Sequence, residues 1–268
     1  MKTVLVTGST DGIGLETARQ LLAAGMHVLV HGRSEAKAAR QANALASRVP
    51  GARTAPVWGD FSRMREVAKL AEQVRAITPV LDVLINNAGI YAQRRTITED
   101  GFESTMAVNH FAPYLLTRLV GPLVSKAPAG RIVTVSSMAH QSGDIDLDDL
   151  TFEHGFDAYN VYATSKLANI LFTRALATRL AGGNVTANCL HPGVIDTKLL
   201  HAGFSIKGAS VEKGARTSVY LATSEKVAGV SGKYFDNCRE TTPSRQARND
   251  ELAEALWLVS EQLVSGYL

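Results

Sequence analysis

The chain has 268 residues, of which 46% are hydrophobic and 20% are charged, as in an ordinary globular protein. This length allows a large buried core and lies near the upper limit for one domain, a size that α/β folds often reach undivided. The formal net charge is only +3, and the basic residues form no stripe, which argues against a nucleic-acid-binding protein.

Short β-branched runs alternate along the chain with longer segments of helical periodicity. The strands that we expect are residues 3–7, 27–31, 54–58, 80–87, 131–137 and 184–190. Most are apolar almost throughout, which is typical of strands buried on both faces of a parallel sheet. The β-α-β order predicts an α/β fold, a single-domain Rossmann-like doubly wound parallel β-sheet flanked by helices, over residues 1–268.

The C-terminal region has a different composition. Residues 198–212 are rich in Gly, Ser and Lys and predict a mobile segment, which we interpret as a substrate lid. Helices are expected at 211–223 and 246–264, with a short strand at 233–235. The acidic run at 144–150 lacks the glycine and the last acidic residue of a calcium loop, so we expect a solvated insertion and no metal site.

A glycine-rich turn, TGSTDGIG at residues 7–14, connects the first strand to a helix. Its glycines allow a tight turn and close approach of the backbone to a pyrophosphate, and the helix adds free N–H groups and the positive end of its dipole. Such a turn can be purely structural, but its position in a βαβ unit is the one that dinucleotide binding requires. The residues that we assign to cofactor binding here are Gly8, Ser9, Asp11, Gly12, Ile13 and Gly14.

The second strand ends where a dinucleotide-binding protein reads the adenosine ribose. The residues there are His31, Gly32, Arg33 and Ser34, with no carboxylate to bind a free 2′-hydroxyl group. Gly32 leaves space, and the guanidinium of Arg33 suits a 2′-phosphate. We therefore predict NADP(H), with NAD(H) as the alternative if Arg33 merely lies on the surface.

Several further motifs follow the glycine turn in order. They are NNAG (86–89), VNHF (108–111), VSS (135–137), YATSK (162–166) and HPGVIDT (191–197). Together they resemble the short-chain dehydrogenase/reductase family over essentially the whole chain. The stretches VNHFAPYLLT, SSMAH and YATSKLANILFTR are similar to its retinol-dehydrogenase-like branch, which also has a comparably long insertion between Ser137 and Tyr162.

On the adenosine side, the resemblance implies two further contacts. The NNAG turn, with Asn87, Ala88 and Gly89, would close over the adenosine and steady the central sheet. Asp60, after the third strand, matches the acidic residue that contacts adenine in the family. Taken singly, these residues would be read as a structural turn and a cap.

On the nicotinamide side, the resemblance implies that Asn109 holds a water molecule in a proton relay. It also implies that Thr197, which follows Pro192 and Gly193, contacts the carboxamide of the nicotinamide. The structural alternatives are a helix kink at Asn109 and a helix cap at Thr197.

Reduction of a carbonyl requires a proton donor in addition to the hydride that NADPH supplies. A tyrosine is a suitable acid, but its ordinary pKa of about 10 makes it a poor base at neutral pH, and a nearby lysine ammonium lowers that pKa. Tyr162 lies one helical turn from Lys166, roughly 6 Å along the axis, whereas Tyr159 lies two turns away, roughly 10 Å. We therefore predict Tyr162 as the acid, and Tyr159 as a packing or pocket-wall residue.

A serine at the end of the fifth expected strand can bind the carbonyl oxygen. Ser136 and Ser137 point to opposite faces, and chemistry alone excludes neither. The family pattern favours Ser137, which gives Asn109, Ser137, Tyr162 and Lys166 as the catalytic residues.

We therefore predict an NADP(H)-dependent oxidoreductase that interconverts a carbonyl and an alcohol. The substrate is expected to be a small apolar molecule, because residues 199, 200, 204 and 206 of the lid are apolar; the alternative is that these side chains pack internally. A non-catalytic NADP(H)-binding regulator and a dehydratase or epimerase remain alternatives. The family also implies a homo-oligomer through helices at 99–124 and 158–180.

The two cysteines, Cys189 and Cys238, lie in apolar surroundings and form no CxxC pair. Reduced thiols of this kind favour a cytoplasmic compartment. The first strand begins too early to leave room for a signal peptide, and no apolar run reaches the ~18 residues of a membrane span. We expect neither a membrane nor a nucleic-acid partner.

Overall fold

An eight-stranded sheet forms the centre of the molecule in the computed structural model, which describes residues 1–268. The strand order is β3-β2-β1-β4-β5-β6-β7-β8, and only β8 is antiparallel to its neighbour. The strands are β1 (Thr3–Val6), β2 (His27–Gly32), β3 (Arg53–Trp58), β4 (Val83–Asn86), β5 (Gly130–Val135), β6 (Val185–His191), β7 (Tyr234–Asp236) and β8 (Arg239–Glu240). The predicted doubly wound α/β fold is confirmed.

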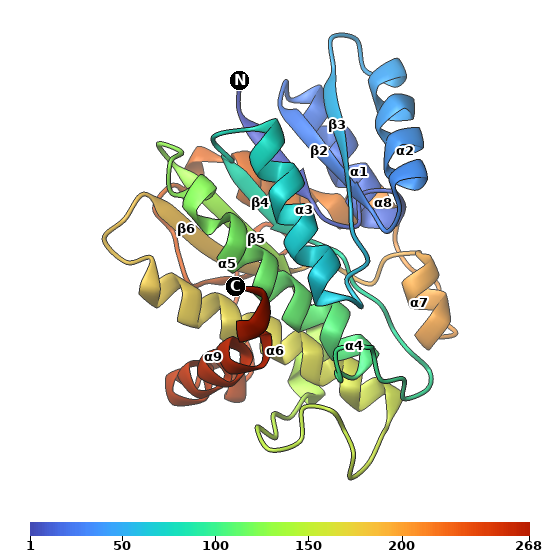
Figure 1. Cartoon of the computed structure of the whole chain (residues 1–268), viewed down its shortest axis with the longest axis vertical. Coiled ribbons are helices and arrows are strands. Elements are labelled where there is room, and N and C mark those ends of the chain that lie inside the picture. Colours follow the sequence, from blue (N-terminus) through green and yellow to red (C-terminus); the bar gives the residue numbers. More distant parts are fainter.

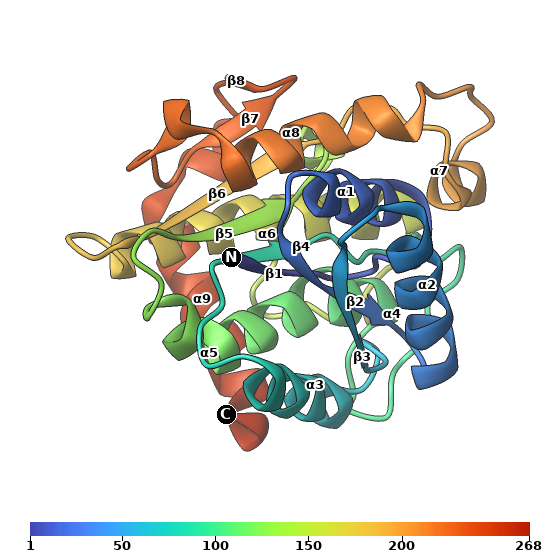
Figure 2. The ribbon, with the colours of Figure 1, turned by 90° about the horizontal axis from the view of Figure 1, so that it is seen from above.

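Helices cover both faces of this sheet (Figures 1 and 2). They are α1 (Gly12–Ala23), α2 (Glu35–Arg48), α3 (Met64–Ile77), α4 (Ser104–Met106), α5 (Ala112–Val124), α6 (Ala158–Arg179), α7 (Lys198–Gly203), α8 (Val211–Thr223) and α9 (Asp250–Val264). In β1, Val4 and Val6 pack into the core that includes α1 and α8, whereas Leu5 packs into the core that includes α3, α5 and α6. Successive side chains of β1 enter the two cores on opposite faces of the sheet. Consecutive positions of this strand must therefore be apolar, as the run Val4–Val6 is.

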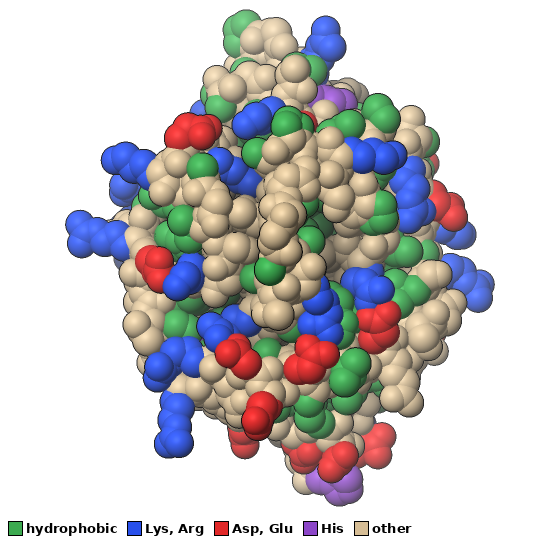
Figure 3. Space-filling model, turned by 90° about the vertical axis from the view of Figure 1, so that its left-hand side faces the viewer, with side chains coloured by type: hydrophobic (Ala, Val, Ile, Leu, Met, Phe, Trp, Pro, Cys, Tyr) green, Lys and Arg blue, Asp and Glu red, His purple; other side chains and the backbone are tan.

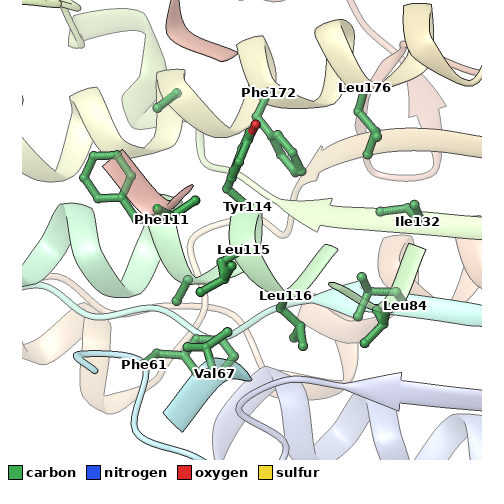
Figure 4. Packing of buried hydrophobic residues seen from close by; sticks show 14 of the residues in the cluster. Phe61, Val67, Leu84, Phe111, Tyr114, Leu115, Leu116, Ile132, Phe172 and Leu176 are labelled. Carbon is green, nitrogen blue, oxygen red and sulfur yellow. The ribbon is translucent and has the colours of Figure 1, made fainter. Parts of the chain in front are cut away.

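The larger core lies between the sheet and helices α3, α5, α6 and α9. Figure 4 shows its centre, where Tyr114 of α5 and Phe172 of α6 lie side by side. Trp257 of α9 stacks on Phe172, with ring centroids 5.9 Å apart, and meets Tyr114 edge-on. Helix α9 thereby covers part of the surface of α5 and α6 through which we expected copies of the chain to associate.

The edge strands of the sheet are β3, which contains a proline, and β8, which is very short. At one edge, β3 contains Pro56, which has no N–H group to contribute to a sheet. At the other edge, β8 has only the two exposed residues Arg239 and Glu240.

Three predicted elements differ from the observed ones. The expected helix at 99–124 is divided into α4, a π-helical turn (Ala107–Phe111) and α5. The last helix begins at Asp250 and is preceded by a separate 3-10 turn (Gln246–Arg248). Residues 198–212, predicted as a mobile segment, contain helix α7 and a bridge between Ile195 and Ala209, so this segment has more regular structure than its composition indicates.

The surface carries charges of both signs. On the face shown in Figure 3, lysine and arginine side chains are interspersed with acidic ones, and apolar side chains form small separate groups. None of the helices combines the length and the apolar character that crossing a membrane requires.

Candidate active site

A cleft of about 1190 Å³ opens at the carboxyl ends of the parallel strands, where open α/β sheets bind their ligands. The structure brings nearly all predicted site residues to its walls. The residues of our prediction that line it are Gly8, Asp11, Gly12, Ile13, Gly14, Arg33, Asp60, Asn87, Ala88, Gly89, Ser137, Tyr162, Lys166, Pro192, Gly193 and Thr197. The two exceptions, Ser9 and Asn109, are fully buried behind the wall.

The glycine turn forms one end of the cleft. Gly8 and Gly12 have positive φ angles of 65° and 54°, which glycine adopts without strain. A Cβ atom on Gly14 would lie 2.4 Å from both the carbonyl oxygen of Gly8 and Nδ2 of Asn87. The turn therefore presents backbone without side chains at the N-terminus of α1. The side chain of Asp11 accepts a hydrogen bond from the N–H of Gly12. This cradle fits the pyrophosphate of a dinucleotide.

A histidine that the sequence analysis treated only as part of a strand end holds this turn in place. Nδ1 of His31 accepts a hydrogen bond from the N–H of Gly8 at 2.9 Å, and Nε2 lies 3.0 Å from the carbonyl oxygen of Gly59. The ring stacks on Phe61, and burial lowers its pKa to about 4. The imidazole is therefore neutral, with its proton on Nε2. The hydroxyl of Ser9 accepts from the backbone N–H of His31, so Ser9 supports the turn from behind.

The adenosine side combines an exposed cation with well-anchored polar groups. Arg33 lies exposed at the end of β2. The carboxylate of Asp60 accepts hydrogen bonds from the N–H and the hydroxyl of Ser62, so it caps a turn while lining the cleft. The side-chain amide of Asn87 donates to the carbonyl oxygen of Thr7 at 2.8 Å, which fixes the NNAG turn to the end of β1.

The two serines after β5 have separate roles. Ser136 is buried, and its hydroxyl donates to the carbonyl oxygen of Lys166 at 2.7 Å. Ser137 lines the cleft, and its hydroxyl accepts a hydrogen bond from the N–H of Ala139. Both follow β5, which ends at Val135. Both serines line the cleft, but the hydroxyl of Ser136 is engaged with the main chain of Lys166, whereas Ser137 interacts with Tyr162.

Tyr162 and Lys166 lie one turn apart on α6, as the sequence predicted. Nζ of Lys166 is 5.5 Å from the centre of the Tyr162 ring and donates to the carbonyl oxygen of Val135. Burial lowers the pKa of Lys166 to about 8. Burial also raises the pKa of Tyr162 to about 12, against the opposing effect of a hydrogen bond with Ser137. This direction is opposite to the one that we expected, because desolvation of the buried phenol is the largest effect on its pKa.

Asn109 lies in the π-helical turn before α5. Its Oδ1 accepts from the N–H of Ile90 at 2.8 Å, and its Nδ2 donates to the carbonyl oxygen of Ile90 and to the hydroxyl of Ser165, each at 3.0 Å. The side chain therefore joins the loop after β4 to helix α6. The π-helical turn agrees with the structural alternative of an irregular helix at Asn109, and the role of Asn109 in a proton relay stays a prediction.

Comparison with known proteins agrees with this geometry. The family model for short chain dehydrogenase matches residues 2–205. Retinol dehydrogenase 14 of Homo sapiens is 40% identical over 289 residues, covering 98% of this chain and 86% of that protein. Retinol dehydrogenase 12 of Bos taurus is 38% identical over 273 residues, again with 98% and 86% coverage. The chain belongs to the short-chain dehydrogenase family.

Solved structures of similar fold lead to the same family. An uncharacterised protein from Mycobacterium paratuberculosis is 33% identical, with a TM-score of 0.84 and coverage of 99% of this chain and 94% of that one. A gluconate 5-dehydrogenase from Burkholderia cenocepacia in complex with NADP and tartrate is 26% identical, with a TM-score of 0.70 and coverage of 87% and 92%. This short-chain dehydrogenase is thus an NAD(P)-dependent oxidoreductase that acts on alcohols or carbonyls, related to the retinol-dehydrogenase-like branch.

Aromatic residues lie near Tyr162 in this short-chain dehydrogenase. The ring of Tyr91, which the sequence analysis did not single out, is 5.5 Å from that of Tyr162 and 5.6 Å from that of Phe204. Tyr159 lines the cleft and meets Phe204 edge-on, consistent with its predicted place in a pocket wall. The end of the cleft beside Tyr162 is therefore largely apolar.

Helix α7 contributes to the wall of the cleft. Thr197 caps it by accepting a hydrogen bond from the N–H of Leu200, and Leu199 and Leu200 line the cleft. At one end, Lys198 forms an ion pair with Asp11 of the glycine turn. At the other, the side-chain amide of Gln93 donates to the carbonyl oxygen of Ala202. The first residues of the expected lid thus contact both the cofactor turn and the loop after β4.

Proposed function

We propose that this short-chain dehydrogenase uses NADP(H) in preference to NAD(H) and interconverts an apolar aldehyde or ketone with its alcohol, with Tyr162 as acid and base. The observation that carries the proposal is the convergence of Ser137, Tyr162 and Lys166 on one wall of a cleft whose far end is the glycine turn. The turn would hold the pyrophosphate, and Arg33 the 2′-phosphate.

The proposed chemistry divides among these three side chains. When bound, the cofactor supplies the hydride for the carbonyl carbon. The hydroxyl of Ser137 donates a hydrogen bond to the carbonyl oxygen and stabilises the negative charge that develops there. Tyr162 gives its proton to that oxygen, which completes the alcohol and leaves a tyrosinate. The ammonium of Lys166, close to the ring, stabilises this anion.

The pKa of Tyr162 favours the reductive direction of this reaction. A phenol with a pKa of about 12 is protonated at neutral pH and is ready to act as the acid. Oxidation of an alcohol requires the tyrosinate instead, which becomes more populated as the pH rises. We therefore expect the rate of alcohol oxidation to increase from pH 6 to pH 8, where Lys166 still carries charge, whereas the rate of carbonyl reduction should change little because its acid stays protonated.

The substrate that we propose carries its carbonyl on an apolar body. The support is the set of apolar and aromatic side chains beside Tyr162 together with the names of the retinol dehydrogenases that this chain resembles. Residues 198–212 would cover the substrate, since residues of α7 line the cleft.

The catalytic proposal is tested with Tyr162→Phe. NADPH consumption is followed with a panel of aldehydes and ketones of graded hydrophobicity, including retinal, and NADPH binding is measured separately by fluorescence. The variant should lose turnover and keep its affinity for NADPH. Turnover at the parent rate in the variant would refute the role of Tyr162, and a parent that consumes no NADPH with any carbonyl would favour a regulator or a dehydratase.

The cofactor preference is tested with Arg33→Ala. A hydrogen bond to a charged group contributes about 1.5–3 kcal/mol, so KM for NADPH should rise by about 10- to 100-fold while KM for NADH stays nearly constant. Arg94→Ala, which removes an exposed arginine outside the cleft, is the matched control. A parent that uses NADH as well as NADPH would contradict the proposal.

A further inference from the structure

Two buried histidines that the proposed chemistry does not use lie beside the segment that carries Ser137. His140 belongs to the 3-10 turn after β5 (Met138–Ser142), and His191 is the last residue of β6. Their exposed fractions are 1% and 7%. Both rings form hydrogen bonds with the same peptide group, the one that joins Ser137 to Met138.

His140 holds the carbonyl side of this peptide group. Its Nδ1 lies 2.6 Å from the carbonyl oxygen of Ser137, so Nδ1 carries the proton and donates it. Its Nε2 accepts a hydrogen bond from the N–H of Ser244 at 3.1 Å, and the ring meets Tyr234 edge-on. The ring is thus fixed in one tautomer between the catalytic segment and the chain before α9.

His191 holds the amide side of the same peptide group. Its Nδ1 accepts a hydrogen bond from the N–H of Met138 at 3.2 Å, which requires a neutral ring with the proton on Nε2. The next two residues, Pro192 and Gly193, line the cleft. His191 therefore links the main chain at Ser137 directly to the loop on the nicotinamide side.

We propose that His140 and His191 are positioning residues that clamp the Ser137–Met138 peptide group from both sides and so fix the direction of the Ser137 hydroxyl. This inference rests on the proposed function, because Ser137 is the group that it positions. Rotation of this peptide group would turn the adjoining backbone dihedrals of Ser137 and Met138. It would also break both hydrogen bonds to the imidazoles, which stabilise the observed orientation of this peptide group.

The test uses substitutions that keep or remove single ring nitrogens. In His191→Asn, Oδ1 can replace Nδ1 as acceptor, and in His140→Asn, Nδ2 can replace Nδ1 as donor. His191→Leu and His140→Leu keep a bulky side chain but have no hydrogen-bonding group. If the leucine variants do not fold, His191→Gln replaces them, because its amide lies too far along the side chain to take the place of Nδ1. Steady-state kinetics, NADPH binding and hydrogen exchange of the Met138 amide are measured for each variant.

The leucine variants should lower kcat by at least about tenfold, as for a misplaced catalytic group, while the dissociation constant for NADPH changes by less than about twofold. The asparagine variants should recover most of kcat. In a Ser137→Ala background, His191→Leu should lower kcat by less than about a further twofold, because the effects of coupled residues are not additive. Exchange of the Met138 amide should accelerate at least tenfold in His191→Leu and stay slow in His191→Asn.

Two outcomes separate this inference from the proposed function. A parent chain that reduces carbonyls with NADPH, together with leucine variants of unchanged kcat and unchanged Met138 exchange, would overturn the clamp alone. A parent chain without NADPH-dependent turnover would overturn the proposed function, and slow Met138 exchange that depends on His191 would then still establish the anchoring of the peptide group. His154→Leu, at an exposed histidine of the insertion, is the control for the loss of an imidazole as such.

Discussion

Replacing His31 with glutamine should make the stability of the protein less sensitive to acid. The pKa of His31 is lowered from 6.5 to about 4 because the ring is buried. As the pH falls below 6.5, the unfolded chain takes up a proton at this residue that the folded chain still excludes, so the free energy of unfolding decreases. One pKa unit corresponds to about 1.4 kcal/mol. His31 alone should therefore cost the protein about 2 kcal/mol between pH 7 and pH 5, and about 3 kcal/mol by pH 4.

Urea unfolding at pH 7 and pH 5 measures this effect. The parent, His31→Gln and the control His154→Gln are compared by the decrease in free energy of unfolding between the two pH values. That decrease should be smaller by about 2 kcal/mol in His31→Gln and unchanged in the control, whose ring is exposed. The comparison of two pH values removes any constant cost of the substitution. An equal decrease in His31→Gln and in the parent would refute the assignment of His31 as a buried neutral group.

Further expectations concern packing and surface charge. Gly14→Ala should abolish detectable NADPH binding in a fluorescence titration, because its Cβ would lie 2.4 Å from the Gly8 carbonyl oxygen; normal binding would contradict the observed turn. Trp257→Ala should lower the free energy of unfolding by about 3 kcal/mol, measured with urea, since the ring packs against α5 and α6; a change below about 1 kcal/mol would mean that α9 is loosely attached. Lys198→Ala should change stability by less than about 1 kcal/mol despite its ion pair, because both partners are exposed; a larger loss would show that the pair anchors α7.

The strands of the sheet were predicted well from the sequence, because the signals for strands and helices lie within short segments of the chain. Each strand buried on both faces must be apolar throughout, and the helices between the strands carry their own periodicity. The π-helical turn at Ala107–Phe111 could not be predicted from apolar periodicity. The apolar spacing continues through this turn, and only the backbone hydrogen bonds change, from i→i+4 to i→i+5. Helix α7 was also missed, because its support comes from contacts with the distant residues Asp11 and Gln93.

For the site, the sequence predicted which residues meet but not their surroundings. The spacing of Tyr162 and Lys166 on one helix brought them together as expected. The direction of the Tyr162 pKa depends on how deeply the phenol is buried, which residue spacing does not reveal. The role of His31 could not be derived either, because its partners Gly8 and Gly59 follow two other strands.

The two edges of the sheet limit how copies of this protein can associate. An exposed strand edge offers a row of N–H and carbonyl groups on which another chain can add a strand and begin to aggregate. Here one edge strand carries Pro56, and the other consists of only Arg239 and Glu240. Pro56 and the shortness of β8 weaken the two edges as templates, so edge-to-edge growth is disfavoured. Assembly of this oxidoreductase is therefore left to contacts between helices and loops.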